Sequence, residues 1–309
     1  MALHLVLSDK LTRIVLLGTC LLLVVASTVG LILRLRAHDE EQLRGTRNLV
    51  ARIGAWWVMV MLLAAALAAG RAGVTLLFAV ASFIGVGEML TVRDVSRAVR
   101  WWLLPVVAVQ YWLVWDGQPA RFALLVTLCT PIYIWLVRTL TCGDWRERDA
   151  YVSVLICVWC ISHVPALATM SRRDDVASLK LVIWLLIVVE MSDVLQYCWG
   201  KLFGRHKVVP RVSPNKTWEG LIGGVLSATV LGVLLRGLTP FTMLGAAVVS
   251  LIATLAGFCG GLIMSSMKRR AGVKDFGTII VGHGGVMDRL DSLALAGPVF
   301  FWLVVGWYA

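Results

Sequence analysis

Apolar segments about as long as a lipid bilayer is thick recur from one end of this chain to the other, and they constrain its fold more than any other feature. A helix needs about 20 residues to cross the hydrocarbon core. The 309 residues are 59% hydrophobic and only 15% charged, whereas a soluble domain carries about 25% charged residues. The chain is therefore predicted to be an all-α, polytopic integral membrane protein built as a helical bundle.

About ten transmembrane helices are predicted, or nine if the two short segments at 101–115 and 122–137 form one re-entrant pair. The predicted spans are Ile14–Leu33, Ile53–Gly70, Val74–Val92, Trp101–Trp115, Phe122–Val137, Tyr151–Met170, Leu181–Cys198, Leu221–Leu235, Phe241–Met267 and Leu293–Tyr308. Most of the glycine-rich, charged connections follow residue 190. We therefore distinguish an N-terminal transmembrane region, 1–190, from a C-terminal transmembrane region, 191–309, whose loops are expected to carry the chemistry.

The positive charge of the chain is distributed unevenly between its connections. A net charge of +11 would suggest a nucleic-acid partner in a soluble protein, but here the connections at 34–52, 93–100, 138–150, 199–220 and 268–292 hold 21 of the 29 lysines and arginines. Cytoplasmic loops of membrane proteins carry such an excess. These loops are therefore predicted to face the cytoplasm from the cell inner (cytoplasmic) membrane, and no nucleic-acid partner is expected.

Two spans contain carboxylates. Glu88 lies inside the third span, where an ionisable group is a functional hypothesis by default; because Arg93 is close in sequence, a structural or interface role is favoured and a role in a site is left open. In the seventh span Glu190, Asp193 and Tyr197 follow at spacings of three and four, which places them on one helical face. Two carboxylates there repel unless a proton or a cation lies between them, and a buried structural network is the alternative.

A basic loop follows this span, and its segment Ser213–Glu219 reads SPNKTWE. Ser, Asn and Thr favour turns and N-caps, so we predict a turn that leads into a helix start, whose free N–H groups suit an anion. Lys216 would add a point charge for a phosphate. An ordinary cytoplasmic loop explains the same composition equally well.

The third polar segment, Lys274–Asp291, interrupts the last apolar stretches. Asp288 and Asp291 share a face if the final helix begins near Val286, with Arg289 pointing elsewhere. Carboxylates combined with Lys and Arg at a membrane interface suit a metal-bound triphosphate, and a solvated loop of ion pairs is the alternative. The segment also contains glycines, which let a backbone approach a ligand closely.

In residue type and order, these motifs resemble those of the phosphatidate cytidylyltransferases, or CDP-diacylglycerol synthases. The matching C-terminal signature comprises Ser265, Lys268, Arg269, Lys274, Asp275, Gly277, Gly282, His283, Gly284, Gly285, Asp288, Arg289 and Asp291. The matching upstream elements comprise Asp193, Tyr197, Gly200, Phe203, Gly204, Ser213, Pro214, Lys216, Thr217, Glu219 and Gly220. The N-terminal half is similar only in general character.

This resemblance implies an enzyme that converts CTP and phosphatidate to CDP-diacylglycerol and pyrophosphate, with Mg²⁺ as cofactor. It assigns catalytic roles to Asp288, Lys274, His283 and Arg289. It assigns substrate binding to Ser213, Lys216, Thr217, Glu219, Lys268, Arg269 and Tyr197. It assigns the metal to Asp288 as principal ligand, with Asp275, Asp291 and Asp193 in support. The implied partners are CTP, phosphatidate or a similar lipid phosphate, and the bilayer; a homodimer is one possible assembly.

Two positions depart from the family pattern. Val281 stands where proline is usual, which is expected to change only loop stiffness. Gly261 stands where the family has an aspartate that helps to hold the metal, so another carboxylate would have to substitute, or the enzyme is weakened or specialised. The alternatives are therefore a cytidylyltransferase that acts on another lipid phosphate and a non-catalytic lipid-binding or transport paralog.

Overall fold

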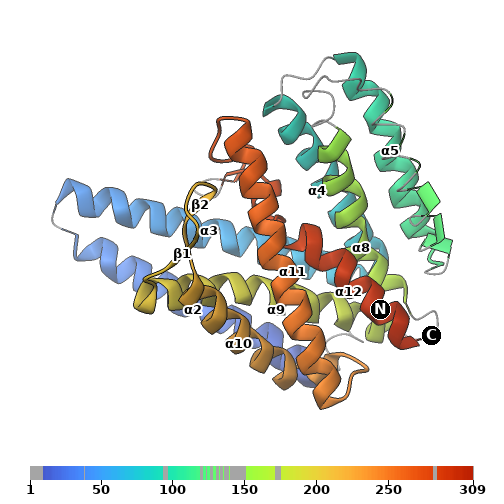
Figure 1. The fold of residues 1–309 in the computed structure, drawn as a ribbon. Helices are drawn as coiled ribbons and strands as arrows, with labels where there is room; N and C mark the ends of the chain where they lie inside the picture. The colour runs from blue at the N-terminus through green and yellow to red at the C-terminus, as the bar shows by residue number, and fades with distance from the viewer. Residues whose placement is uncertain are drawn as a thin grey trace.

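A computed structural model of the chain describes residues 10–37, 39–92, 97–118, 151–170, 175–280 and 284–308, with a few positions between 121 and 139. The long helices are α2 (Lys10–Leu35), α3 (Glu40–Ala68), α4 (Gly70–Val92), α5 (Arg97–Trp115), α9 (Asp175–Phe203), α10 (Trp218–Leu234), α11 (Met243–Arg270) and α12 (Leu293–Tyr308) (Figure 1). The short helical elements are η1 (Leu155–Cys160), α8 (Ile161–Ala166), η2 (Leu167–Thr169), η3 (Arg236–Leu238) and η4 (Met287–Arg289). Two strands, β1 (Lys207–Val209) and β2 (Ser213–Thr217), form a hairpin.

Much of the described chain is long and apolar enough to cross a membrane. Five segments meet this criterion, namely Lys10–Leu35, Gly45–Ala68, Gly70–Val92, Tyr151–Thr169 and Met243–Arg270. Three shorter apolar helices are Pro105–Trp115, Trp218–Leu234 and Leu293–Tyr308. The prediction of an all-α, polytopic helical membrane protein is confirmed. The predicted span at 122–137 lies largely outside the described residues, so the number of about ten spans stays a prediction.

Helices α9 and α10 pack antiparallel through glycines. A Cβ atom at Gly220 would lie 3.1 Å from the Cα atom of Gly200, and Gly232, further along α10, faces the ring of Trp184 near the beginning of α9. Small residues of this kind allow helix backbones in membranes to approach closely. Because α9 and α10 approach each other closely, the β1–β2 hairpin that connects them is held near the end of α9.

An aromatic core ties α9 to α12. The Trp184 ring stacks on Phe300 with centroids 5.0 Å apart, and its indole N–H donates to the Gly232 carbonyl at 3.1 Å. Both rings are completely buried, so their packing contributes several kcal/mol in total, since removing a buried aromatic side chain costs about 3–5 kcal/mol. This contact holds the middle of α12 against α9.

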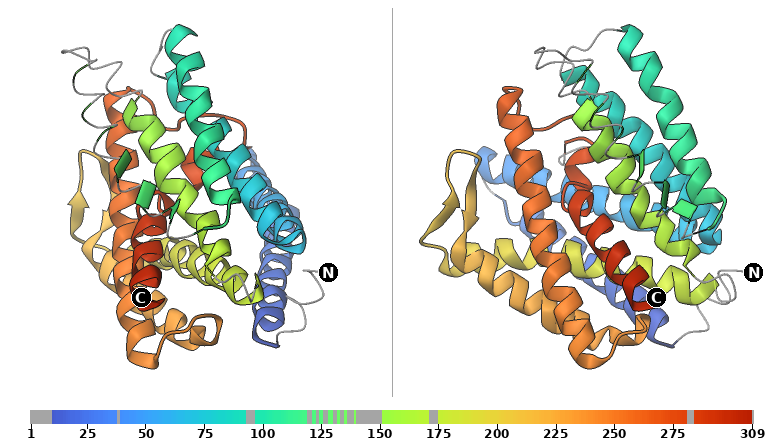
Figure 2. Two further views of the ribbon diagram at one scale, coloured as in Figure 1. Left: turned by 90° about the vertical axis from the view of Figure 1, so that its right-hand side faces the viewer. Right: turned by 45° about the vertical axis from the view of Figure 1, so that its right-hand side comes forward.

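The β1–β2 hairpin projects from one edge of the bundle, with α5 at the opposite edge (Figure 2). Lys207 pairs with Thr217 and Val209 with Ser213. Residues Ser213–Thr217 are therefore a strand, where the sequence predicted a turn. Their backbone pairs with β1, and in a turn the side chains of Ser, Asn and Thr would have bonded that backbone instead. The predicted helix start is present, because the Thr217 hydroxyl caps α10 by accepting from Gly220 N at 3.1 Å.

Candidate functional site

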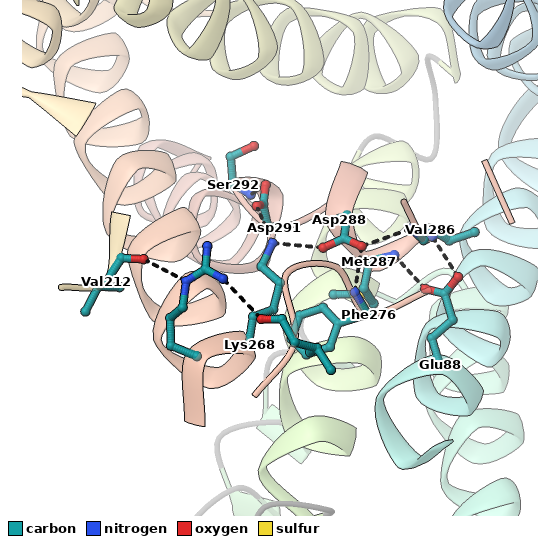
Figure 3. Close-up of polar contacts among 12 residues, drawn as sticks. Glu88, Val212, Lys268, Phe276, Val286, Met287, Asp288, Asp291 and Ser292 are labelled. Atoms are coloured by element: carbon teal, nitrogen blue, oxygen red, sulfur yellow. Dashed lines mark hydrogen bonds and ion pairs between the residues drawn. The ribbon is translucent and has the colours of Figure 1, made fainter. Parts of the chain in front are cut away.

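Polar side chains from distant parts of the sequence meet inside the bundle (Figure 3). The close-up shows side chains from α4, from the end of α11 and from the turn before α12: Glu88, Lys268, Asp288 and Asp291. Asp193 of α9 and Lys216 of β2 interact electrostatically with Asp291. The site therefore joins the three polar segments that the sequence singled out to one carboxylate of the N-terminal region.

Asp288 is the most heavily bonded residue of the site. Its Oδ1 accepts from Lys268 Nζ at 2.8 Å, and its Oδ2 accepts from the backbone N–H groups of Phe276 at 2.8 Å and Gly285 at 2.9 Å. The side chain is only 1% exposed. A buried carboxylate needs such partners, because an unpaired buried charge costs several kcal/mol. Asp288 thereby fixes the end of α11, the loop after it and the turn before α12 relative to one another.

The glycine beside this carboxylate is required by the backbone. Gly284 has φ +86°, a conformation that costs other residues about 1 kcal/mol or more. A Cβ atom there would also lie 2.8 Å from Asp288 Oδ2 and 3.0 Å from the Cβ of Asp275. The glycine at 284 therefore lets the chain pass close to Asp288, while the expected close approach of this segment to a ligand stays a prediction.

Glu88 holds the same turn from the other side. It is 7% exposed, and its two oxygens accept from Val286 N at 2.9 Å and Met287 N at 3.1 Å. Two glycines pack against the carboxylate, and a Cβ atom at Gly277 would lie 2.5 Å from Glu88 Oε1. Glu88 thus binds the turn that carries Asp288, which makes it an interface residue at the site.

A second group of carboxylates lies towards α9. Asp291 Oδ1 accepts from Ser292 N at 2.9 Å, and Oδ2 lies 4.0 Å from Lys268 Nζ. Burial and the neighbouring Asp193 carboxylate raise the pKa of Asp291 to about 6. Asp193 also hydrogen-bonds the Ser292 side chain, and Glu190 is repelled by both Asp193 and Asp291. Glu190 and Asp193 therefore share a face, as their spacing predicted.

Three cations balance these carboxylates. Lys268 bonds Asp288, Lys216 attracts Asp193 and Asp291, and Arg289 attracts the same two carboxylates together with Glu190. The expected start of the final helix near Val286 is wrong. Helix α12 begins at Leu293, and Asp288 and Arg289 lie in the separate turn η4.

The hairpin that carries Lys216 is braced by Glu219. The Glu219 carboxylate accepts from Arg205 N at 3.1 Å and His206 N at 3.2 Å, and it pairs with His206 Nδ1 at 2.6 Å. Hydrogen bonds from its own backbone N–H and from the His206 ring lower the pKa of Glu219 to about 2. Thr217 is buried as the α10 cap. Both residues therefore position Lys216 in this structure.

The remaining predicted site residues lie further out or outside the described chain. Tyr197 is 66% exposed, and Lys274 and Asp275 are also exposed. Arg269 donates to the carbonyl groups of Val212 at 3.4 Å and Val273 at 3.2 Å, which links α11 to the hairpin. The other two predicted positions are Ser213, the half-buried first residue of β2, and His283, which lies outside the described residues.

The carboxylates can be tested for their fit to a divalent ion. Within the described chain, no three His, Cys, Asp or Glu side chains are grouped as a complete metal site. Mg²⁺ often binds one or two carboxylates together with substrate phosphates. Asp193 and Asp291, whose carboxylates repel each other, would supply such a pair, and this assignment stays a prediction. Asp288 has both oxygens taken by protein donors, so its role as principal ligand stays a prediction.

Fold and site together define a class, that of helical membrane proteins with a buried, mixed-charge site suited to a phosphorylated ligand. Comparison with known families agrees with this class. The cytidylyltransferase family model matches residues 50–306, which is most of the chain. The protein belongs to the cytidylyltransferase family.

Individual relatives support the same assignment. The uncharacterized protein YnbB of Escherichia coli strain K12 is 35% identical over 82% of this chain and 86% of its own. The phosphatidate cytidylyltransferase of Mycobacterium bovis is 30% identical over 72% of this chain and 79% of its own. That of Mycobacterium leprae is 38% identical, but the match spans 51% of this chain and 50% of the relative. Of these two phosphatidate cytidylyltransferases, the one with the higher sequence identity is thus matched over only about half of this chain.

Two contributors were not among the predicted site residues. Glu88 was recognised as unusual, but only the fold shows which N–H groups it binds. In the sequence, nothing except its position next to Asp291 indicates a role for Ser292 in the site. Its backbone N–H binds Asp291 and its side chain binds Asp193, so it links two carboxylates that are remote in sequence.

Proposed function

We propose that the protein transfers the cytidylyl group of CTP to the phosphate of phosphatidate, which yields CDP-diacylglycerol and pyrophosphate. The observation that carries this proposal is the convergence of Lys216, Lys268 and Arg289 with Asp193 and Asp291 inside a membrane bundle of the cytidylyltransferase family. Such a mixture suits a triphosphate better than it suits an apolar ligand. The relatives named phosphatidate cytidylyltransferase support the choice of acceptor.

One orphaned donor supports a ligand rich in oxygen. The Nε atom of Arg289 is buried and has no hydrogen-bond partner among the described residues. Buried polar groups are nearly always bonded, so an exception calls for a ligand, an ion or a water molecule. Arginine presents donors in a planar fork that matches phosphate. We assign this donor to a phosphate of CTP or of the lipid.

The proposed transfer needs positioning more than acid–base chemistry. The phosphatidate phosphate is already an anionic nucleophile, so its oxygen can attack the α-phosphorus of CTP in line while the bond to the β-phosphate oxygen breaks. Lys216, Lys268 and Arg289 would stabilise the negative charge that develops on the departing pyrophosphate. Holding the two anions together in a site with fixed donors supplies much of the remaining acceleration.

Asp193 and Asp291 would hold Mg²⁺, which when bound neutralises phosphate charge. The apolar helices around the site would leave the lipid tail in the bilayer, while the nucleotide would arrive from the cytoplasmic side, where the basic loops are predicted to lie. We accordingly place the protein in the cell inner membrane.

Purified protein in detergent, incubated with CTP labelled at the α-phosphate, phosphatidate and Mg²⁺, should form labelled CDP-diacylglycerol. Lys268→Met should abolish the product, whereas Lys201→Met, which removes an exposed lysine from the last turn of α9, should retain it. Absence of any lipid-linked nucleotide from the wild-type protein, with phosphatidate or with other lipid phosphates, would refute the proposal.

A different lipid phosphate is the second candidate acceptor. The match to the cytidylyltransferase family names no acceptor, and neither does the relative from E. coli that aligns over 82% of this chain. The same assay with a panel of lipid phosphates separates the two candidates. A higher kcat/KM for another acceptor would assign the protein to that substrate.

A further inference from the structure

The turn η4 is held by two carboxylates that reach its backbone from different parts of the chain. Three successive N–H groups, those of Gly285, Val286 and Met287, lie at its beginning. Asp288 accepts from the first at 2.9 Å, and Glu88 of α4 accepts from the other two at 2.9 Å and 3.1 Å. Figure 3 shows the backbone of the turn between these two carboxylates. Successive N–H groups in a turn form an anion-binding concavity, and here a side chain from α4 fills most of it.

The surroundings of Glu88 admit a carboxylate and nothing bulkier. A Cβ atom at Gly285 would lie 2.6 Å from Glu88 Cδ, and one at Gly277 would lie 2.5 Å from Glu88 Oε1. Bare backbone of the turn and of the loop after α11 therefore encloses the carboxylate from two sides. Both of its oxygens are taken by backbone N–H groups. These are the contacts of a residue that places the turn.

Helix α4 also receives a side chain of the turn. Met287 is completely buried, and a Cβ atom at Gly85 would lie 2.7 Å from its Sδ atom. Gly85 is three residues before Glu88, which places both on one face of α4. The Cys157 Sγ atom of η1 lies 3.7 Å from the same Cβ position. The missing side chain at 85 thus makes room for Met287, so the turn is fixed to α4 through its backbone and through a side chain.

The next two residues of η4 belong to the proposed phosphate site. Asp288 is bonded to Lys268 at 2.8 Å. Its neighbour Arg289 has a buried Nε atom without a hydrogen-bond partner among the described residues. A displacement of the backbone at 286–287 is passed to both side chains, because only one or two peptide units separate them. Misplacement of a reacting group by about 1 Å can cost roughly 100-fold in rate, so the place of this turn matters for the proposed transfer.

We propose that Glu88 is a positioning residue of the phosphate site. By bonding two backbone N–H groups of the turn, it fixes the places of Asp288 and Arg289. This inference rests on the proposed function, because it takes these two residues to act on phosphates. It makes α4 of the N-terminal region a part of the site and not only a membrane anchor.

Glu88→Gln tests whether the carboxylate holds the turn. The amide keeps the length of the side chain but replaces one acceptor by a donor, so one of the two N–H groups loses its bond. In the purified protein in detergent, without substrates, a fragment that covers residues 284–290 should take up deuterium about tenfold faster than in the wild type, because a buried N–H group without a partner favours local opening. Mass spectrometry of peptic fragments measures this exchange.

The transfer assay tests whether the turn positions the phosphate-binding groups. With CTP and the lipid phosphate that the wild type uses, Glu88→Gln should raise the KM of at least one of the two substrates about fivefold and lower kcat about tenfold. A defect of folding alone lowers kcat, because fewer molecules are active, and leaves KM unchanged. The double variant Glu88→Gln/Gly285→Ala should be at most about twofold less active than the weaker single variant, because both substitutions break the same contact.

Ser82→Ala is the matched control. Ser82 is a buried polar residue of the same helix, and its hydroxyl bonds the Cys157 carbonyl and the Tyr111 hydroxyl, each at 2.6 Å. The melting temperature should fall, as it does for Glu88→Gln, because buried polar groups lose a partner. Exchange at 284–290 and both KM values should equal those of the wild type. Gly277→Ala, which displaces the Glu88 carboxylate from the other side, replaces Glu88→Gln if that variant does not purify as a folded protein.

Unchanged exchange at 284–290, or KM values for both substrates equal to those of the wild type, would overturn the proposal. A wild-type protein that forms no product would refute the proposed function instead. The exchange measurement needs no turnover, so it would still decide whether Glu88 holds the turn.

Discussion

The α2–α3 pair and the α9–α12 region are both rich in apolar residues, yet they use them differently. On α2 the large side chains face outwards, as Leu17 at 64% and Leu21 at 65% exposure illustrate. On α9 most of the large apolar side chains at positions 181–189 are buried, among them Trp184 and Leu185, which are buried completely. Lipid tails are as apolar as leucine, so a lipid-facing helix needs apolar side chains but no close fit to its surroundings. A helix in the protein interior also needs side chains whose shapes fit those of the neighbouring helices.

The glycines show the same contrast. On α2 and α3, Gly18, Gly45 and Gly54 have nothing within 4 Å of a Cβ position. In the C-terminal region, Gly224 and Gly285 face backbone or a carboxylate at distances that no side chain would tolerate. Substitutions in the two regions should therefore differ in effect far more than their compositions do.

The largest effect is expected for Asp288→Asn. The amide cannot pair with Lys268 or accept from both N–H groups as the carboxylate does, and leaving a buried charge without its partner costs about 3–5 kcal/mol. CTP turnover should fall at least about 100-fold, as for the loss of an electrostatic group at a reacting centre. Turnover by thin-layer chromatography, together with thermal unfolding in detergent, separates loss of chemistry from loss of fold. Near-normal activity would contradict the assignment of the site.

Gly285→Ala should act through Glu88. The added methyl group meets the Glu88 carboxylate, so the bonds to Val286 N and Met287 N must lengthen, at a cost of about 1–3 kcal/mol for buried N–H groups left without a partner. Turnover should fall roughly tenfold, which is the factor for about 1.4 kcal/mol of lost transition-state stabilisation.

Gly87→Ala on α4 is the control for this variant, because nothing lies within 4 Å of its Cβ position. Its melting temperature and turnover should equal those of the wild type. Equal effects of the two substitutions would show that the glycines of α4 and of the turn matter for helix flexibility and not for the Glu88 contact.

Gly261→Asp should change the site without unfolding it. The new carboxylate would lie beside Lys216 Nζ and pair with it, which draws the ammonium group from Asp193 and Asp291. We expect turnover to fall about fivefold, which corresponds to roughly 1 kcal/mol of lost transition-state stabilisation. The radiolabel assay of the purified variant measures this. A gain of turnover over a silent wild type would instead show that the wild-type site has decayed.

Glu219→Gln should loosen the hairpin. Because the pKa of Glu219 is lowered to about 2 from 4.5, the contribution of its carboxylate is present above pH 4.5 and is lost only as the pH falls through about 2. Turnover near neutral pH should thus not depend on its titration, but the variant should lose about twofold to threefold through poorer positioning of Lys216. Faster tryptic cleavage at Arg205, Lys207 and Arg211 would locate the loosening, and unchanged cleavage would contradict it.

Much of this architecture was predictable because the bilayer imposes one length and one polarity on every span. The face shared by Glu190 and Asp193 followed from helical periodicity, and the cap at Thr217 followed from residue type. The family motifs picked out Lys216, Lys268, Asp288 and Asp291, which the fold does bring together.

What sequence periodicity could not supply was contact between remote segments. Val286 N and Met287 N bond a carboxylate almost two hundred positions earlier in the chain, and no local pattern encodes that distance. The start of the final helix was predicted wrongly for a related reason. Helix α12 begins at Leu293, after the turn η4, in which Asp288 is bonded to Lys268, Phe276 and Gly285.

The smallest effect is expected for Leu21→Ala on α2. Leu21 is 65% exposed, so the change removes methyl groups that face lipid, and stability should shift by less than about 0.5 kcal/mol, as at other surface positions. Leu185→Ala makes the same chemical change at a buried position of α9, where the cavity costs about 2–5 kcal/mol. The melting temperatures of the two variants and of the wild type, measured in the same detergent, give the difference in stability. If Leu21→Ala proves as harmful as Leu185→Ala, the outer face of α2 must be covered by protein and not by lipid alone.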